Sequence, residues 1–238
     1  AGTYKLDILS ISDSNSKTIE VYTADMQTKV ATLAGTAACE YYIESLEAGT
    51  YIIMAAACGK DVTIKNVIPK HLESITAKLI ECGVVVEEFD DSVRIFSDCR
   101  PNHCSVKTMP HPGVPTDMQP QFAALLSIAD GTSIITENVW NNRYQYVSEL
   151  CRFGANITVD VRKAIIEGVP NLTSSTVRAT DLRAGAALII AALAAHGTSE
   201  IGDIIHIERG YEDIIEKLRG VGADIRRQTI GSPIVYTA

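Results

Sequence analysis

The chain has 238 residues, 46% of them hydrophobic and 21% charged, which is typical of a globular protein with a buried core. Its formal net charge of −8 argues against general nucleic-acid binding, because that function needs a basic surface. The longest apolar stretch, residues 184–195, is shorter than the roughly 20 residues that cross a membrane. We therefore expect one large or two small globular domains, with neither nucleic acid nor membrane as partner.

The N-terminal residues read as two strands. Residues 5–11 and 17–23 alternate between apolar and polar side chains, and residues 13–16 (Asp-Ser-Asn-Ser) have the composition of a turn. This pattern predicts a β-hairpin. Residues 1–41 do not match the remainder of the chain, so we expect an N-terminal segment whose strands join the domain that follows.

From residue 42 onward the chain repeats itself. A run of small apolar residues ends in glycine, and a second glycine follows 23–25 residues later, in three pairs: Gly59 with Gly83, Gly131 with Gly154, and Gly197 with Gly222. The repeats lie about 65–70 residues apart, so each should be a small supersecondary module rather than a solenoid unit. We expect one domain over residues 42–238, with repeats at about 42–107, 108–173 and 174–238.

Within each repeat the pattern predicts a helix, a strand, a second helix and two strands. The first helices are expected at residues 48–58, 118–129 and 182–195, the strands after them at 61–66, 133–136 and 199–204, the second helices at 71–82, 144–153 and 211–219, and the closing strands at 84–89 with 92–95, 156–161 with 163–167, and from 223 onward. The helix at 182–195 is apolar on nearly every face, which indicates complete burial. Three such helices should pack in the centre and leave the sheets outside.

Six cysteines are present: Cys39, Cys58, Cys82, Cys99, Cys104 and Cys151. An even number could indicate disulfides in a secreted protein, but no signal peptide is recognisable, so we expect reduced thiols in the cytoplasm. Cys99 and Cys104, with His103 and His111 nearby, offer zinc as an alternative. Their spacing is not a common zinc-ligand pair, and we expect no metal and no cofactor.

Polar residues recur where the buried helices begin. Thr116 and Asp117 open the second, and Thr180, Asp181 and Arg183 open the third. Helix capping alone explains Thr and Asp at these positions. An arginine at a helix start is unfavourable to the helix dipole, unless an anion binds at the same end.

Two further arginines, Arg143 and Arg209, stand just before the second helices of their repeats. A surface salt bridge is the simpler explanation for each arginine alone. For Arg143, Arg183 and Arg209 together we favour an anion site.

Four motifs in order resemble the C-terminal half of a known family. They are His-Pro-Gly-Val-Pro-Thr-Asp-Met-Gln at residues 111–119, Thr-Glu-Asn-Val-Trp-Asn-Asn-Arg at 136–143, Arg-Ala-Thr-Asp-Leu-Arg-Ala at 178–184, and His-Ile-Glu-Arg-Gly-Tyr-Glu at 206–212. This part of the chain is similar to the UDP-N-acetylglucosamine 1-carboxyvinyltransferases, the enolpyruvyl transferases of peptidoglycan synthesis.

The resemblance implies an α/β fold, an inside-out α/β barrel of three βαβαββ repeats as in the EPSP-synthase-like enolpyruvyl transferases. It implies transfer of enolpyruvyl from phosphoenolpyruvate to the 3-hydroxyl of UDP-N-acetylglucosamine, in the cytoplasm. Asp117 would be the catalytic base, and Arg143, Arg183 and Arg209 would bind phosphoenolpyruvate. Asp181 would orient these arginines, and Val139, Trp140 and Leu182 would contact substrate; the family usually has Phe where Trp140 stands.

The family enzyme is about twice this length, and its other domain carries a loop with a Cys general acid that none of these six cysteines matches. The resemblance therefore implies half of an active site, with the missing N-terminal domain as partner and no activity for this chain alone. Two alternatives are a non-catalytic sugar-nucleotide-binding or regulatory module of the same fold, and the sister enolpyruvyl transferase of the shikimate pathway. The motif at residues 136–143 argues against the latter.

Overall fold

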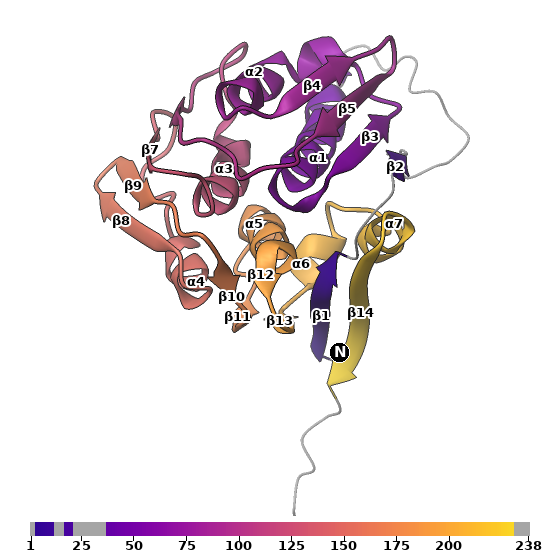
Figure 1. Cartoon of the computed structure of the whole chain (residues 1–238), viewed down its shortest axis with the longest axis vertical. Helices are drawn as coiled ribbons and strands as arrows, with labels where there is room; N and C mark the ends of the chain where they lie inside the picture. Colours follow the sequence, from indigo (N-terminus) through magenta and orange to yellow (C-terminus); the bar gives the residue numbers. More distant parts are fainter. Residues whose placement is uncertain (1–2, 12–16, 21–36, 231–238) are drawn as a thin grey trace, which may run out of the picture.

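Three helices form the centre of the protein. The computed structural model describes residues 3–11, 17–20 and 37–230, with side chains for 47–228. Helices α1 (Ala37–Cys58), α3 (Gln119–Leu126) and α5 (Leu182–Ala194) pack against one another. Figure 1 shows them inside, with the sheets around them. The predicted arrangement of central helices and peripheral sheets is confirmed.

Small side chains allow these helices to approach closely. Ala186, Ala187, Ala191 and Ala192 of α5 are fully buried, as are its larger residues Leu188, Ile189 and Ile190. Burying a Leu or Ile side chain stabilises a fold by about 1.5–3 kcal/mol, so a helix buried on every side is a large contributor to stability. The apolar sequence of α5 is the reason for its central position.

Three four-stranded sheets of the described residues share one pattern. Their orders are β2-β3-β5-β4, β6-β7-β9-β8 and β11-β13-β1-β14; in each, the first pair is parallel and the other two pairs are antiparallel. The strands are β1 (Thr3–Ile11), β2 (Lys17–Glu20), β3 (Asp61–Lys65), β4 (Val85–Glu88), β5 (Ser92–Phe96), β6 (Ser105–Lys107), β7 (Thr132–Thr136), β8 (Asn156–Asp160), β9 (Lys163–Glu167), β11 (Thr176–Arg178), β13 (Ser199–Gly202) and β14 (Ala223–Ile230). A fourth, two-stranded sheet joins β10 (Leu172–Thr173) to β12 (Ala195–His196).

The predicted N-terminal hairpin is wrong. β1 lies between β13 and β14 and is antiparallel to both, whereas β2 pairs in parallel with β3 in another sheet. The third repeat supplies only β11, β13 and β14, so its sheet lacks the strand that β5 and β9 provide in the others. β1 fills that position. The predicted turn at residues 13–16 and the strand end at 21–23 lie outside the described residues.

Other element boundaries also differ from those predicted. α1 begins at Ala37 rather than at residue 48, and the three-residue strands β6 and β11 were too short for periodicity to reveal them. The second helices are shorter: α2 (Glu73–Glu81), α4 (Val147–Arg152) and α7 (Ile214–Gly220). A separate short helix, α6 (Ile205–Glu208), precedes α7, and Asp213 at φ 45° interrupts the helical path between them.

The residues weighed as zinc ligands have other contacts. Cys104 is buried with its Sγ 3.1 Å from Sγ of Cys82, and His103 Nδ1 lies 2.9 Å from the carbonyl oxygen of Asp130. Among the described residues no group of three metal-binding side chains comes together. In the same part of the chain, none of the helices has the length and apolar character needed to cross a bilayer.

A close approach at Gly168 provides a test of this packing. A Cβ added there would lie 1.8 Å from the carbonyl oxygen of Ala129, whereas one added at Gly220 would meet nothing within 4 Å. We expect Gly168→Ala to lower the free energy of unfolding in urea by about 1–3 kcal/mol or more, because the backbone must shift. Gly220→Ala should be neutral or slightly stabilising. Equal effects of the two substitutions would contradict the described packing.

Candidate active site

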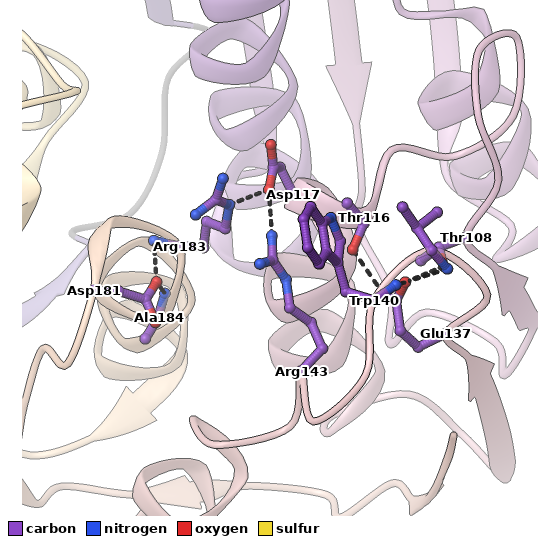
Figure 2. A network of polar contacts seen from close by, with 10 residues as sticks. Thr108, Thr116, Asp117, Glu137, Trp140, Arg143, Asp181, Arg183 and Ala184 are labelled. Carbon is purple, nitrogen blue, oxygen red and sulfur yellow. Dashed lines mark hydrogen bonds and ion pairs between the residues drawn. The ribbon is translucent and has the colours of Figure 1, made fainter. Parts of the chain in front are cut away.

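An ion-pair cluster centred on Asp117 lies at the start of α3. Asp117 belongs to the 3-10 turn Thr116–Met118 that leads into α3, and its side chain is only 8% exposed. Nη2 of Arg143 lies 2.5 Å from Asp117 Oδ1, and Nε of Arg183 donates to the same oxygen. Figure 2 shows the two guanidinium groups converging on this carboxylate. The structure therefore brings together three of the predicted site residues, which come from distant parts of the sequence.

The two arginines reach Asp117 from different elements. Arg143 stands in the loop between β7 and α4, directly after Asn142, whose φ of 56° turns the chain at that point. Arg183 lies in the first turn of α5, so its contact with Asp117 places the N-terminal ends of α3 and α5 side by side. Nε of Arg143 is buried and has no acceptor among the described residues. A carboxylate with two guanidiniums at two helix N-termini is suited to binding an anion.

Asp181 caps α5. Its Oδ1 accepts hydrogen bonds from the backbone nitrogens of Arg183 at 2.8 Å and Ala184 at 3.0 Å. The capping interpretation of this residue is therefore correct, and Figure 2 shows its side chain directed at its own helix. The cap fixes the backbone from which Arg183 extends. Leu182 packs against Gly210, where an added Cβ would lie 2.7 Å from Leu182 Cδ1.

A buried carboxylate that the sequence reading left without a role holds the neighbouring loop. Glu137 is 1% exposed and accepts hydrogen bonds from the hydroxyls of Thr108 and Thr116 and from the backbone nitrogens of Val139 and Trp140. Val139 and Trp140 themselves are 41% and 58% exposed. The sequence signal was weak, because an acidic residue at the end of a strand usually faces solvent.

Arg209 does not join the Asp117 cluster. It is the exposed residue directly after α6, and no hydrogen bond or ion pair within the described residues links it to Asp117, Arg143 or Arg183. Its neighbour Gly210 nevertheless lies against Leu182 at the start of α5. Of the three arginines predicted to converge, Arg143 and Arg183 meet at Asp117, and Arg209 lies outside that cluster.

A second buried polar network lies behind the site. Lys217 Nζ is 3.0 Å from Glu47 Oε1, and burial raises the pKa of Glu47, while Lys217 opposes that rise. Thr50 Oγ1 lies 2.9 Å from the hydroxyl of Tyr211 and accepts a hydrogen bond from Gln121 at 3.1 Å. Burial raises the pKa of Tyr211 to about 12, so this hydroxyl stays neutral. These contacts join α1, α3, α7 and the segment before α7.

Comparison with known proteins identifies the family. A family model described as EPSP synthase (3-phosphoshikimate 1-carboxyvinyltransferase) matches residues 15–218. The chain belongs to this family. Among solved structures of the family's fold, the enolpyruvyl transferase NikO from Streptomyces tendae has a TM-score of 0.68 and 30% identity, over 79% of this chain and 45% of that one. An EPSP synthase from Acinetobacter baumannii has a TM-score of 0.65 at 19% identity, over 77% of this chain and 46% of its own, and shares the fold alone.

More similar relatives carry one name. UDP-N-acetylglucosamine 1-carboxyvinyltransferase 3 of Caldanaerobacter subterraneus subsp. tengcongensis is 54% identical over 191 residues, which is 79% of this chain and 46% of the relative. UDP-N-acetylglucosamine 1-carboxyvinyltransferase of Clostridium botulinum gives the same identity over the same shares. The chain spans a little under half the length of these curated relatives.

The cap at Asp181 can be tested by two substitutions. We expect Asp181→Ala to lower the free energy of unfolding by about 1 kcal/mol, because two backbone N–H groups of α5 lose their acceptor. Asp181→Asn should lower the free energy of unfolding by at most a few tenths of a kcal/mol, since Asn caps helices about as well as Asp. Urea unfolding followed by circular dichroism measures both. A large loss with Asn would mean that the charge of Asp181, rather than its cap, stabilises this helix end.

Proposed function

We propose that this chain forms the C-terminal part of a UDP-N-acetylglucosamine 1-carboxyvinyltransferase. The whole enzyme would transfer enolpyruvyl from phosphoenolpyruvate to the 3-hydroxyl of UDP-N-acetylglucosamine, the first committed step of peptidoglycan synthesis, in the cytoplasm. The observation that carries the proposal is 54% identity to relatives of that name over about four fifths of this chain. The Asp117 cluster supplies charged groups of the kind that this chemistry needs.

In this proposal Asp117 is the base that accepts the proton of the sugar 3-hydroxyl. The hydroxyl oxygen would form a bond to C2 of phosphoenolpyruvate while a general acid of the other domain protonates C3, which opens the C2=C3 double bond. C3 would then lose a proton as the bond between C2 and the phosphate oxygen breaks, which forms the enol ether and releases inorganic phosphate. Without substrate, Asp117 is held by Arg143 and Arg183. A phosphate or carboxylate that binds the same guanidiniums competes with Asp117 for them, which leaves its oxygen able to take the proton. Binding of the donor and activation of the acceptor are then coupled.

The remaining residues serve substrate binding. Val139 and Trp140, both exposed beside the cluster, would contact the sugar nucleotide, together with Leu182. Arg209 would approach the phosphate or carboxylate of phosphoenolpyruvate from α6, and Asp181 would hold Arg183 in place through the cap. A general acid and further cationic residues would come from the domain that accounts for the relatives' remaining length, which is the partner that this chain requires.

The first test is turnover. The purified chain alone should release no phosphate from phosphoenolpyruvate and UDP-N-acetylglucosamine, because closure of a second domain completes such a site. Adding the N-terminal domain of a close relative should restore measurable release, and the same mixture with Asp117→Asn should not. Turnover by the chain alone, in preparations free of host enzyme, would show that the half-site proposal is wrong. A complemented mixture with no turnover but with sugar-nucleotide binding would favour a binding module instead.

The second test concerns Arg209. Losing one charge-assisted contact typically costs on the order of 1.5–3 kcal/mol. We therefore expect Arg209→Ala to weaken binding of phosphoenolpyruvate by roughly tenfold to a hundredfold in calorimetry. Its melting temperature should change little, because the side chain is exposed.

Arg152→Ala provides the matched control, because Arg152 is an exposed arginine on α4 that pairs with Glu149. If Arg209→Ala unfolds more easily while its ligand affinity is unchanged, Arg209 is a structural residue and has no place in the anion site.

A further inference from the structure

Glu137 is the most completely surrounded carboxylate near the candidate site. Its Oε1 accepts from Thr108 Oγ1 at 2.9 Å, from Val139 N at 2.8 Å and from Trp140 N at 3.0 Å, and its Oε2 accepts from Thr116 Oγ1 at 2.9 Å. All four donors are uncharged. A carboxylate is an acceptor only, so these four bonds engage both oxygens and hold the group in one orientation.

The donors belong to three separate segments of the chain. Thr108 follows β6, Thr116 directly precedes Asp117, and Val139 with Trp140 form the loop that leads to Arg143. Asn138 strengthens the connection, because its backbone nitrogen donates to Thr108 Oγ1 at 3.0 Å and its side-chain nitrogen to the Thr108 carbonyl at 3.2 Å. One buried carboxylate thus connects the residue next to Asp117 with the loop that carries Trp140 (Figure 2).

We propose that Glu137 is a positioning residue, which holds the 138–140 loop and the Thr116–Asp117 turn in fixed relation so that Asp117 and Trp140 face the same ligand. The ligand in question rests on the proposed function, but the positioning itself does not. The two carboxylate oxygens bind different segments. Oε1 accepts hydrogen bonds from Thr108 and from the two loop amides, and Oε2 accepts one from Thr116 in the turn. Preorganised groups of this kind depend on such supporting hydrogen bonds.

A simpler explanation is that Glu137 only stabilises the buried region. Removing it leaves buried donors unpaired, and this lowers stability whatever its role. The two explanations differ in what happens to the loop at temperatures where the protein is still folded. Trp140 is the only tryptophan of the chain, so its fluorescence reports on that loop alone. A purely structural role predicts a lower melting temperature with an unchanged Trp140 signal.

The experiment compares Glu137→Ala with two near-isosteric threonine variants in the full chain. Thr108 and Thr116 are both buried, and each variant removes one hydroxyl that donates to Glu137. Thr108→Val also removes the acceptor of Asn138 N, so it should cost more stability than Thr116→Val. Only Thr108 is bonded to the loop side of the carboxylate. We expect Glu137→Ala and Thr108→Val to lower the fluorescence anisotropy of Trp140 and to raise its quenching by acrylamide, well below the melting temperature. Thr116→Val should leave both near the wild-type values.

A ligand titration separates this proposal from the proposed function. The affinity for UDP-N-acetylglucosamine, measured from the quenching of Trp140 fluorescence, should fall about tenfold in Glu137→Ala, as expected for the loss of one good hydrogen bond. Glu167→Gln, which changes an exposed residue at the end of β9 that bonds to Asn156, should not alter it. If the wild-type chain does not bind the sugar nucleotide, the proposed function is in doubt while the anisotropy result still decides the positioning role.

Two outcomes would overturn the positioning role. One is that Trp140 is unaffected in Glu137→Ala and Thr108→Val. The other is that all three variants change it equally, which would indicate general loosening. If Glu137→Ala does not fold, Glu137→Asp, whose carboxylate is one methylene shorter and cannot reach all four donors in the same positions, takes its place in the comparison.

Discussion

Side-by-side packing of three apolar helices in one direction is the constraint on which the rest of the structure depends. At one end, Arg183 in the first turn of α5 contacts Asp117 at the start of α3. At the other end, Cys58 at the end of α1, Ile128 just after α3 and Ala194 at the end of α5 line one hollow of about 440 Å³. The helices are therefore parallel. The N-terminal residues of α3 and α5 are therefore neighbours, although they are more than 60 positions apart in the sequence.

Parallel helices bring like dipole ends together. The N-terminal ends of α3 and α5 concentrate partial positive charge, and Arg183 adds a full one. Asp117 and the cap at Asp181 offset part of this charge. The arrangement costs free energy unless negative charge is present, and this suits the end of the helix bundle to the anion binding that we propose. The packing that buries the apolar surface of α5 thus also creates the electrostatic demand that a substrate phosphate or carboxylate can meet.

Local patterns predicted what depends on local chemistry. The apolar run of α5, the glycines after the helices and the polar residues at the helix starts were all readable, because each reflects burial, backbone conformation or capping of that segment alone. Gly131 and Gly197, for example, adopt φ values of 100° and 99°, which residues other than glycine rarely adopt. The motifs around Asp117, Arg143 and Arg183 then located the cluster by family resemblance.

What the sequence could not predict depends on distant partners. The alternation of residues 5–11 indicates a strand, but only the gap left in the third sheet determines that it pairs with β13 and β14. The same holds for Glu137, because its burial follows from Thr108 and Thr116, about 20 to 30 positions earlier in the chain. Arg209 is the opposite case. Its equivalent position in the third repeat suggested that it would meet Arg143 and Arg183, but equivalent positions in two repeats do not require the same loop geometry. The separate helix α6 places Arg209 on a neighbouring element.

Two carboxylates at this site differ in the donors that surround them, and the difference indicates different roles. Glu137 is bound by uncharged hydroxyls and amides, which an anionic ligand attracts less strongly than it attracts guanidiniums, so we expect these bonds to persist when an anion binds. Asp117 is bound by guanidiniums, which bond equally well to a phosphate or a carboxylate of a ligand. The uncharged donors thus immobilise the carboxylate of Glu137, whereas the guanidiniums can exchange the carboxylate of Asp117 for an anionic group of a ligand. A group that must accept a proton only after an anion has arrived needs the second kind of environment, held in place by the first.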